Sequence, residues 1–581
     1  MSNNYSKYYK KTKADATKDN KKTNIEATKD NRDVAEAQKI DKTIYGILLA
    51  ILAILPLLTR TKVIDFTSPQ ITNSSIGSGT VGDVFTYYKF IFLVIATSIL
   101  IILFLYRTFG IGIPIKKSFI NIPLAILALF VTLSALFAPY KSLALVGMYN
   151  RHEGAITYLC YFTLFFIAVN LTYTKKMLHN VIYALYPIVI VNALLGLLGF
   201  YGVDLIKSSF VRSILLPKGL TEDMIGTGSQ FITTINHGNY VSGISVVLIA
   251  IFMMMFILDK NKIRQALNTL LATLSFAMLL SSLSRSGFLT FVIILPVLVI
   301  LLVRSSEKAK SYGKLAIQLV LFAIIFVAMT THNPKVWDES VGMFVAKNPF
   351  ANDQQAIGAT SLALNSDHYD LKNGSSVILN KEIADQYQKF AKEQLNKVLL
   401  FPTAYADSND KTADEFQLPQ LPESGIGAGS GRLFIWGNTF DLIKQRPLVG
   451  YGLDTFSYHF PQNDPEKIAA LETHTVIVDK PHNLYINILY GSGVLALLAL
   501  LALLAVPFVK AVKTVFTQQL DNEQSIVFIS LFIGWIAYLM QALFNDSVIG
   551  TAPIFWVIFG ISVAIVRGLE VNNEKSFEEK N

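Results

Sequence analysis

Long apolar runs alternate with short polar segments along most of the chain. A helix satisfies its own backbone hydrogen bonds over such a run, whereas barrel strands alternate over about 10 residues. One membrane-spanning helix needs about 20 apolar residues. The pattern therefore predicts an all-α polytopic membrane protein with about twelve transmembrane helices. The predicted spans are 43–59, 85–106, 119–138, 154–172, 179–200, 238–258, 266–283, 287–303, 315–330, 484–507, 525–544 and 550–567.

Composition and charge agree with this class. Apolar residues make up 52% of the 581 residues and charged residues 16%, against about 25% charged in soluble domains. Much of the net charge of +9 lies in alternate short connections, at 107–117, 175–176, 260–264, 304–310 and 510–513. This is the positive-inside pattern, and it predicts that both termini are cytoplasmic. It does not indicate binding to nucleic acid.

The same pattern predicts five parts. They are a charged cytoplasmic tail (1–42), an N-terminal transmembrane bundle (43–235), a core (236–505), C-terminal transmembrane helices (506–568) and a cytoplasmic tail (569–581). The core includes a large loop, 331–482, which is predicted to be extracytoplasmic. Loops longer than about 12–15 residues are usually functional or disordered.

One segment of the large loop has the pattern of an amphipathic helix. "GRLFIWGNTFDLIKQ" (431–445) places Leu433, Trp436, Phe440 and Ile443 at helical spacing, and "RPLVGYG" then ends the helix. We interpret it as a helix on the outer membrane face.

Two arginines are candidate anion ligands. Arg285 in "SLSRSGF" (282–288) lies in a tight hairpin between two spans, and Arg432 in "GSGRLFIW" (429–436) begins the amphipathic helix. A guanidinium binds phosphate in a bidentate fork, and a helix N-terminus favours the same anion. The alternative is that both are ordinary interfacial arginines that extend to the head-group level.

His482 in "KPHNLY" (480–485) is the candidate catalytic residue. It opens a span directly after the outer loop, at the same predicted depth as the two arginines. The ordinary pKa of histidine lies near neutrality, which suits a general base. The alternative is that His482 only caps its helix.

Other polar residues at outer helix starts are possible additional site residues. They are Arg151 in "NRHEG" (150–154), His237 in "TTINHGNY" (233–240) and Asn483 beside His482. Interface anchoring explains Arg151 equally well, and helix capping explains His237. No His-Glu-x-x-His motif, phosphate-binding loop or convincing dinucleotide fingerprint is present, so no metal site and no cofactor are predicted.

Three segments resemble the O-antigen ligase and polymerase family of bacterial membrane glycosyltransferases. They are "SRSG", "GRLFIWGNTFDLIKQRPLVGYGLDTF" and "PHNLYINILYGSGVLALLAL", in the order and spacing of that family. The resemblance covers about 236–505 and makes this region an O-antigen ligase-like core. The chain departs from some relatives by a long insertion at 351–425 and by its charged N-terminal tail.

The resemblance implies a metal-independent glycosyltransferase of cell-surface polysaccharide biosynthesis in the bacterial plasma membrane. It would take a glycan from a polyprenyl diphosphate, such as undecaprenyl diphosphate, and pass it to an acceptor hydroxyl at the outer face. By analogy, Arg285 and Arg432 would hold the diphosphate and His482 would activate the acceptor.

Three functions remain open at this stage. A ligase would join a finished glycan to a lipid, wall polymer or protein, and a polymerase would extend a glycan repeat by repeat. A transporter or flippase for the lipid-linked glycan should place charges and broken helices at mid-membrane depth. The polar candidates lie at outer helix ends instead, which favours an enzyme.

Overall fold

The structure is a computed structural model that describes residues 24–68, 78–203, 205, 208–217, 233–345, 348–350, 431–462, 464, 467, 471, 477–517 and 522–578. The chain divides into two units, 1–343 with 422–581 and 344–421. Every helix and strand named below belongs to the first unit. The insertion 351–425 lies outside the described residues.

Most described residues are helical, as predicted, and the connection 61–84 contains a small antiparallel sheet that pairs Ile64 with Val81. The elements are α2 (Asn24–Ile54), η1 (Leu55–Leu57), β1 (Lys62–Phe66), β2 (Gly79–Asp83), α3 (Tyr87–Leu105), η2 (Tyr106–Gly110), α4 (Asn121–Leu136), α5 (Lys141–Val146), α6 (Ala155–Asn170), α7 (Lys175–Ala184), α8 (Tyr186–Phe200), α9 (Ser209–Leu215), α10 (Gly238–Leu258), α11 (Lys262–Ser281), α12 (Arg285–Leu302), α13 (Lys308–His332), α14 (Lys335–Asp338), η5 (Val341–Met343), α17 (Arg432–Gln445), α18 (Phe456–His459), α20 (Leu484–Thr517), α21 (Glu523–Gln541) and α22 (Ala552–Glu578).

Ten helical segments of the described residues are long and apolar enough to cross a membrane. Each overlaps one of the predicted spans. Helices α7 and α8 together form the segment 175–200, which overlaps the predicted span 179–200. The other two predicted spans, 119–138 and 154–172, correspond to α4 and α6, which are apolar but only 16 residues long. The protein is therefore a multi-pass membrane protein, and the count of twelve spans stays a prediction.

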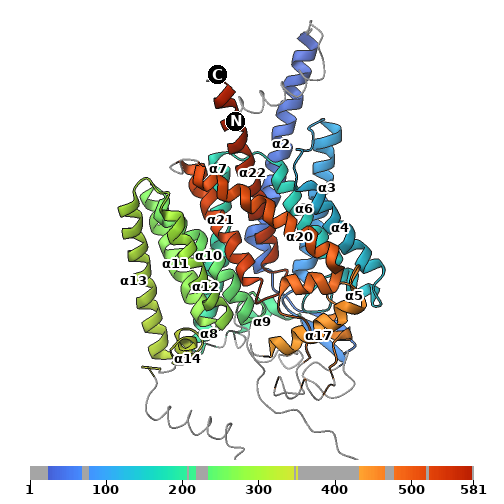
Figure 1. Cartoon of the computed structure of the whole chain (residues 1–581), viewed down its shortest axis with the longest axis vertical. Coiled ribbons are helices and arrows are strands. Elements are labelled where there is room, and N and C mark those ends of the chain that lie inside the picture. The colour runs from blue at the N-terminus through green and yellow to red at the C-terminus, as the bar shows by residue number, and fades with distance from the viewer. Residues whose placement is uncertain are drawn as a thin grey trace, which may run out of the picture. The chain divides into compact units, whose positions relative to one another are not determined.

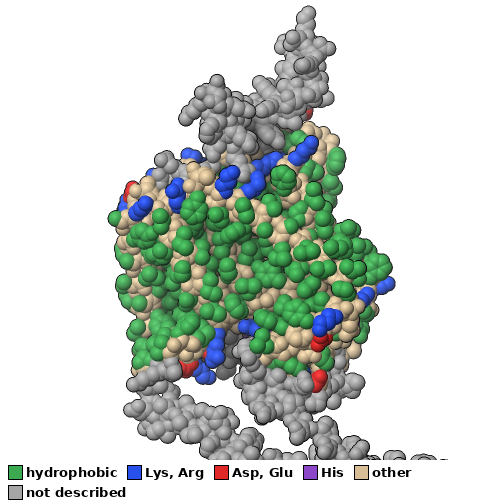
Figure 2. Space-filling view, in the orientation of Figure 1, with side chains coloured by type: hydrophobic (Ala, Val, Ile, Leu, Met, Phe, Trp, Pro, Cys, Tyr) green, Lys and Arg blue, Asp and Glu red, His purple; other side chains and the backbone are tan. Residues whose placement is uncertain are grey.

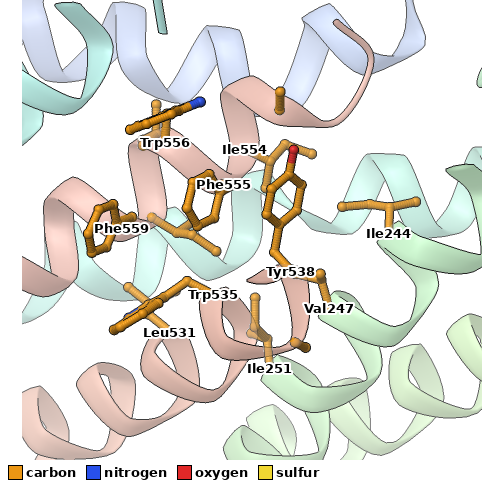
Figure 3. Packing of buried hydrophobic residues seen from close by; sticks show 14 of the residues in the cluster. Ile244, Val247, Ile251, Leu531, Trp535, Tyr538, Ile554, Phe555, Trp556 and Phe559 are labelled. Carbon is orange, nitrogen blue, oxygen red and sulfur yellow. The ribbon is translucent and has the colours of Figure 1, made fainter. Parts of the chain in front are cut away.

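Helix α10 is the centre of the bundle (Figure 1) and packs against α11, α12 and α21. Every residue from Tyr240 to Ile257 is buried. Figure 3 shows how α10, α21 and α22 meet, with Tyr538 stacked on Phe555 at a ring distance of 4.3 Å. Gly534 has no side chain, so α21 can approach Ile251 of α10 closely. This apolar core fixes the positions of the helices whose ends form the site described below.

The two ends of the bundle differ in charge. The first described turn of α2 and the last of α22 extend from the same end (Figure 1), and Lys and Arg form a row along that end above a hydrophobic band (Figure 2). Contacts between connections confirm the grouping, such as Arg107 with Asp41 and Arg264 with Glu523. We call this the basic end. Which end faces the cytoplasm stays a prediction.

The opposite end, here called the pocket end, contains the starts of α10, α12 and α20. The loop after α17 is fixed to α20 there by backbone hydrogen bonds. The N–H of Tyr451 donates to the Tyr490 carbonyl at 3.1 Å, and the N–H of Val494 donates to the Pro447 carbonyl at 2.8 Å. Gly493 interrupts α20 with φ 82°, where a side chain would clash with the loop. These bonds fix α17 beside the start of α20.

Helix α17 has two different apolar faces. Ile435, Thr439 and Ile443 are buried at a spacing of four residues and face the bundle. Ile443, which the sequence analysis grouped with Leu433 and Phe440, thus lies on the buried face instead. Leu433 and Phe440 are 57% and 44% exposed in the part of the chain that the structure describes. Their contact with lipid stays a prediction.

Candidate functional site

A cavity of about 600 Å³, here called the pocket, opens at the pocket end. It is formed by the segments before α3, α6 and α10, by the start of α17, and by residues near 477–482 and 545–550. Four predicted site residues from four distant parts of the chain line it, namely Arg151, His237, Arg432 and His482. Arg285 and Asn483 do not.

His482 lies directly before α20 but does not cap it. The capping alternative applies instead to Asn483, whose Oδ1 accepts the backbone N–H groups of Tyr485 and Ile486 at 3.0 Å each. The Nδ1 atom of His482 lies 3.4 Å from Oδ2 of Asp546, and the His482 side chain is 33% exposed. The imidazole therefore lines the pocket on one side and meets a carboxylate on the other.

Asp546 lies between α21 and α22, and the sequence analysis missed it. Its side chain is 3% exposed, and neither carboxylate oxygen has a hydrogen-bond partner among the described residues. A buried charge is costly unless it is compensated, so His482 is its natural partner. An acidic residue within "FNDSV", between two predicted spans, is the sequence signal that could have indicated it.

Arg432 is the first residue of α17 and follows Gly431, which has φ 77°. Its guanidinium has no hydrogen bond or ion pair with the part of the chain that the structure describes. Burial lowers the pKa of Arg432, and the charge of Asp546 opposes this shift. Arg432 thus offers a charged fork to a ligand in the pocket.

Arg151 is bound by two carboxylates. Its Nη2 lies 2.5 Å from Asp454, and its Nη1 lies 2.8 Å from Asp479. Burial opposes ionisation of Arg151, yet Asp454 and Asp479 raise its pKa above the ordinary value. Burial alone would also raise the pKa of Asp479, but Lys480 and Arg151 lower it to about 2. Arg151 therefore holds the wall of the pocket together.

Two lysines that the sequence analysis did not select also line the pocket. The Lys480 ammonium contacts the Tyr240 hydroxyl and lies 4.7 Å from the centre of that ring. Although burial opposes it, the charge of Asp479 raises the pKa of Lys480. The Lys89 ammonium donates to the carbonyls of Phe85 and Thr234 at 2.8 Å each. The pocket walls therefore carry more positive than negative charge.

His237 has the capping role that the sequence offered as its alternative. Its Nδ1 accepts the backbone N–H of Asn239 at 3.2 Å at the start of α10. Burial, assisted by the charge of Lys480 and His482, lowers the pKa of His237. A neutral imidazole is what a cap that accepts a hydrogen bond requires.

Arg285 was predicted in the hairpin before the span 287–303, and in the structure it is the first residue of α12, but its side chain points to another partner. Its Nε donates to Glu339 at 2.8 Å, and the side chain is 59% exposed. The preceding residue, Ser284, donates to Asn239 on the pocket wall at 2.8 Å. Arg285 therefore lies next to the pocket in sequence without lining it.

Two features fix the backbone around His482. The indole N–H of Trp436 donates to the Pro481 carbonyl at 2.7 Å, so α17 is tied to the residue before the histidine. His482 itself has φ 53°, and Asn150 on the facing wall has φ 60°. Non-glycine residues rarely adopt such angles, and they concentrate at functional sites.

The described residues contain no group of three or more His, Cys, Asp or Glu that could hold a metal ion. The pocket combines a histidine beside a buried carboxylate, an arginine that has no partner among the described residues, and paired cations in its wall. This set can accept a proton and neutralise an anion within one cavity.

A family model described as O-antigen ligase matches residues 270–501. This range contains Arg285, Arg432 and His482 but not Asp546. No curated protein matches the chain. The match makes residues 270–501 an O-antigen ligase-like region of the chain.

Proposed function

We propose that the protein is a glycosyltransferase that moves a glycan from a polyprenyl diphosphate to an acceptor hydroxyl at the outer face of the bacterial plasma membrane. The family supports a membrane glycosyltransferase of the ligase or polymerase type. The observation that carries the proposal is that His482, 3.4 Å from the buried Asp546, and Arg432, which has no partner among the described residues, line one pocket.

In this mechanism His482 is the general base. Oδ2 of Asp546 lies 3.4 Å from Nδ1 of His482, so the carboxylate would accept a hydrogen bond from Nδ1–H after a small approach, which leaves Nε2 to take the proton of the acceptor hydroxyl. As that oxygen attacks the anomeric carbon, the bond between this carbon and the diphosphate oxygen breaks. One direct displacement inverts the configuration at the anomeric carbon.

Arg432 stabilises the diphosphate, because charge develops there as the bond breaks. Arg285 is proposed as a second ligand that exchanges Glu339 for the donor. An exposed ion pair is worth only about 0–1 kcal/mol, so this exchange costs little. The cations take the place of a metal ion, and no cofactor is proposed.

A ligase, a polymerase and a protein O-oligosaccharyltransferase all require this chemistry, since each passes a glycan to a hydroxyl group. The acceptor can therefore be a lipid, a wall polymer, a protein or a growing glycan. A lipid-linked glycan transporter is disfavoured by the position of the pocket residues at helix ends.

The test is turnover by the purified protein in detergent, without a second compartment. A polyprenyl-diphosphate glycan and candidate acceptors are supplied, and released polyprenyl diphosphate is measured. We expect turnover that is insensitive to a chelator. Binding of the lipid-linked glycan without turnover with any acceptor class would favour the transporter, and loss of activity in EDTA restored by a divalent ion would overturn the metal-free mechanism.

A further inference from the structure

A second cavity of about 440 Å³ lies at the basic end, among residues 117–122, α20, α21 and α22. Its walls are packed helices, since α20 contacts α4 and α22, and α21 contacts α22. Apolar side chains, including Val506, Val563 and Val566, form most of the lining. We call it the basic cavity because of the charges beside these walls.

Three cations from separate segments line the basic cavity, namely Lys117, Lys510 and Arg567. None of the described residues that line it is Asp or Glu. The Nη1 atom of Arg567 is buried and has no hydrogen-bond partner within the described ranges. An unsatisfied buried donor beside other cations is costly unless an anion binds there.

Two arginines at this end that do not line the basic cavity each pair with a carboxylate. Arg107 pairs with Asp41 at 2.6 Å, and Arg264 pairs with Asp259 at the same distance. The Nη1 atom of Arg567 has no such partner among the described residues. Burial and, after it, the charges of Arg107 and Arg567 lower the pKa of the neighbouring Lys116 to about 7.

The depth of the basic cavity matches an amphiphile rather than a small anion. It reaches from Lys117 to Trp535, which lies three turns into α21 and is 1% exposed. The indole N–H of Trp535 also has no hydrogen-bond partner among the described residues. Phe119 at the other extreme is 77% exposed and presents an apolar ring to a surrounding bilayer.

We propose that the basic cavity binds an anionic phospholipid, with its phosphate on Lys117 and Arg567 and an acyl chain along α20 and α22. Basic pockets between transmembrane helices favour anionic head groups. Each basic side chain near a membrane surface contributes about 1 kcal/mol, or roughly a 5-fold gain in affinity. The site is separate from the pocket, so it does not depend on the proposed reaction.

The test compares lipids of matched chains on the purified full-length protein. Phosphatidylglycerol and phosphatidylcholine with the same acyl chains are titrated in detergent, and the rise in the unfolding temperature gives the affinity. The test variant is Lys117→Gln with Arg567→Gln. The control is Lys175→Gln with Lys176→Gln, which removes two cations of the same end that do not line the cavity.

We expect stabilisation by phosphatidylglycerol that exceeds that by phosphatidylcholine, weakened roughly 30-fold in the test variant and unchanged in the control. A second variant, Ala511→Leu, narrows the cavity without changing charge and should also weaken binding. Equal effects of the two lipids, or equal losses in the test and control variants, would overturn the proposal. The same stabilisation by inorganic phosphate alone would indicate a simple anion site and overturn it too.

Discussion

The pocket end and the basic end of the bundle both concentrate cations, but they are built differently. All five described non-glycine residues with positive φ lie at the pocket end, namely Asn150, His152, Leu283, Asp454 and His482. At the basic end, helices begin with ordinary side-chain caps, as at Thr174, Asn261 and Asn522. Strained backbone costs of order 1–3 kcal/mol per residue and persists where the surroundings impose it. The difference indicates that the backbone at the pocket end is held in strained conformations of the kind found at functional sites, whereas the helix starts at the basic end are unstrained.

Both ends contain a buried ion pair, Arg151 with Asp454 at the pocket end and Arg107 with Asp41 at the basic end. The pocket end differs because Arg151 also meets a second carboxylate, Asp479, in the wall of a cavity. A buried ion pair seldom stabilises a fold more than apolar residues of the same volume would. The pocket end therefore gives up stability to keep a polar cavity with a fixed geometry.

The largest effect should come from removing the proposed base at the pocket end. His482→Gln keeps a hydrogen-bonding group of similar reach but cannot take up the proton. We expect single-turnover transfer to fall by about 10²–10⁴-fold, with donor affinity little changed, because positioned general bases contribute that much. His332→Gln is the matched control, since His332 is an exposed histidine that does not line the pocket. Near-normal transfer by His482→Gln would remove His482 from the mechanism.

Asp546→Asn should have the next largest effect. Asparagine keeps the size of the side chain but removes the charge that orients Nδ1–H, so the wrong tautomer of His482 becomes available. We expect transfer to fall on the order of 10²-fold. In the His482→Gln background the same change should cost little more, because the two side chains act as one unit. Independent, additive losses would show that Asp546 has a different role.

Arg432→Ala should weaken donor binding, since it removes a pocket cation that has no partner within the described ranges. A hydrogen bond to a charged group is worth about 1.5–3 kcal/mol, so affinity for a polyprenyl diphosphate should fall by about 10- to 150-fold. Arg432→Lys keeps the charge but loses the planar fork, and it should recover only part of the loss. Arg285→Ala should cost less, because Arg285 must first leave Glu339. A larger loss at Arg285 would reverse their roles.

Removing one asparagine helix cap at each end should have a smaller effect, and it should separate stability from activity. Asn261→Ala at the basic end and Asn483→Ala at the pocket end each remove a side-chain cap, so each should cost about 1 kcal/mol of unfolding free energy. Only Asn483→Ala should also reduce transfer once folded protein is normalised, because Asn483 holds the backbone beside His482. Equal activity of the two variants would mean that the position of His482 tolerates movement.

The sequence predicted the helices well because the hydrocarbon core of a membrane leaves a continuous apolar run only one backbone structure, the helix. A run such as 238–258 must be a helix, and α10 occupies those residues with one side chain after another buried. Arg432 was found because it begins a helix within the large outer loop, and His482 because it stands where that loop meets the next span. Their meeting in one pocket agrees with the predicted common depth.

The sequence could not predict the pairings that shape the pocket. Arg151 finds Asp454 and Asp479 more than 300 residues away, and nothing in "NRHEG" names those partners. The pairing of Arg285 with Glu339 was likewise not visible in the sequence, because the two residues are separated along the chain. Asp546 was missed because a single acidic residue between two spans looks like an ordinary polar turn until the fold places it beside a histidine.

The last expected effect is a dependence of stability on pH that arises behind the pocket. Burial raises the pKa of Glu153 to about 8, and its Oε1 accepts the Tyr161 hydroxyl at 2.6 Å. In the unfolded chain this carboxyl loses its proton near pH 4.5, whereas in the folded protein it keeps the proton up to about pH 8. The unfolded state therefore binds fewer protons between these values, and stability falls as the pH rises through that window. The slope is at most about 1.4 kcal/mol per pH unit, which corresponds to one or two degrees in the unfolding temperature of a chain of this size for each pH unit.

Glu153→Gln stays neutral in both states and should flatten this part of the profile between pH 5 and pH 8. At the basic end, Glu307→Gln is the matched control, because Glu307 is exposed and pairs with Lys310. Profiles that fall equally steeply in wild type and Glu153→Gln would show that Glu153 is already ionised in the folded protein.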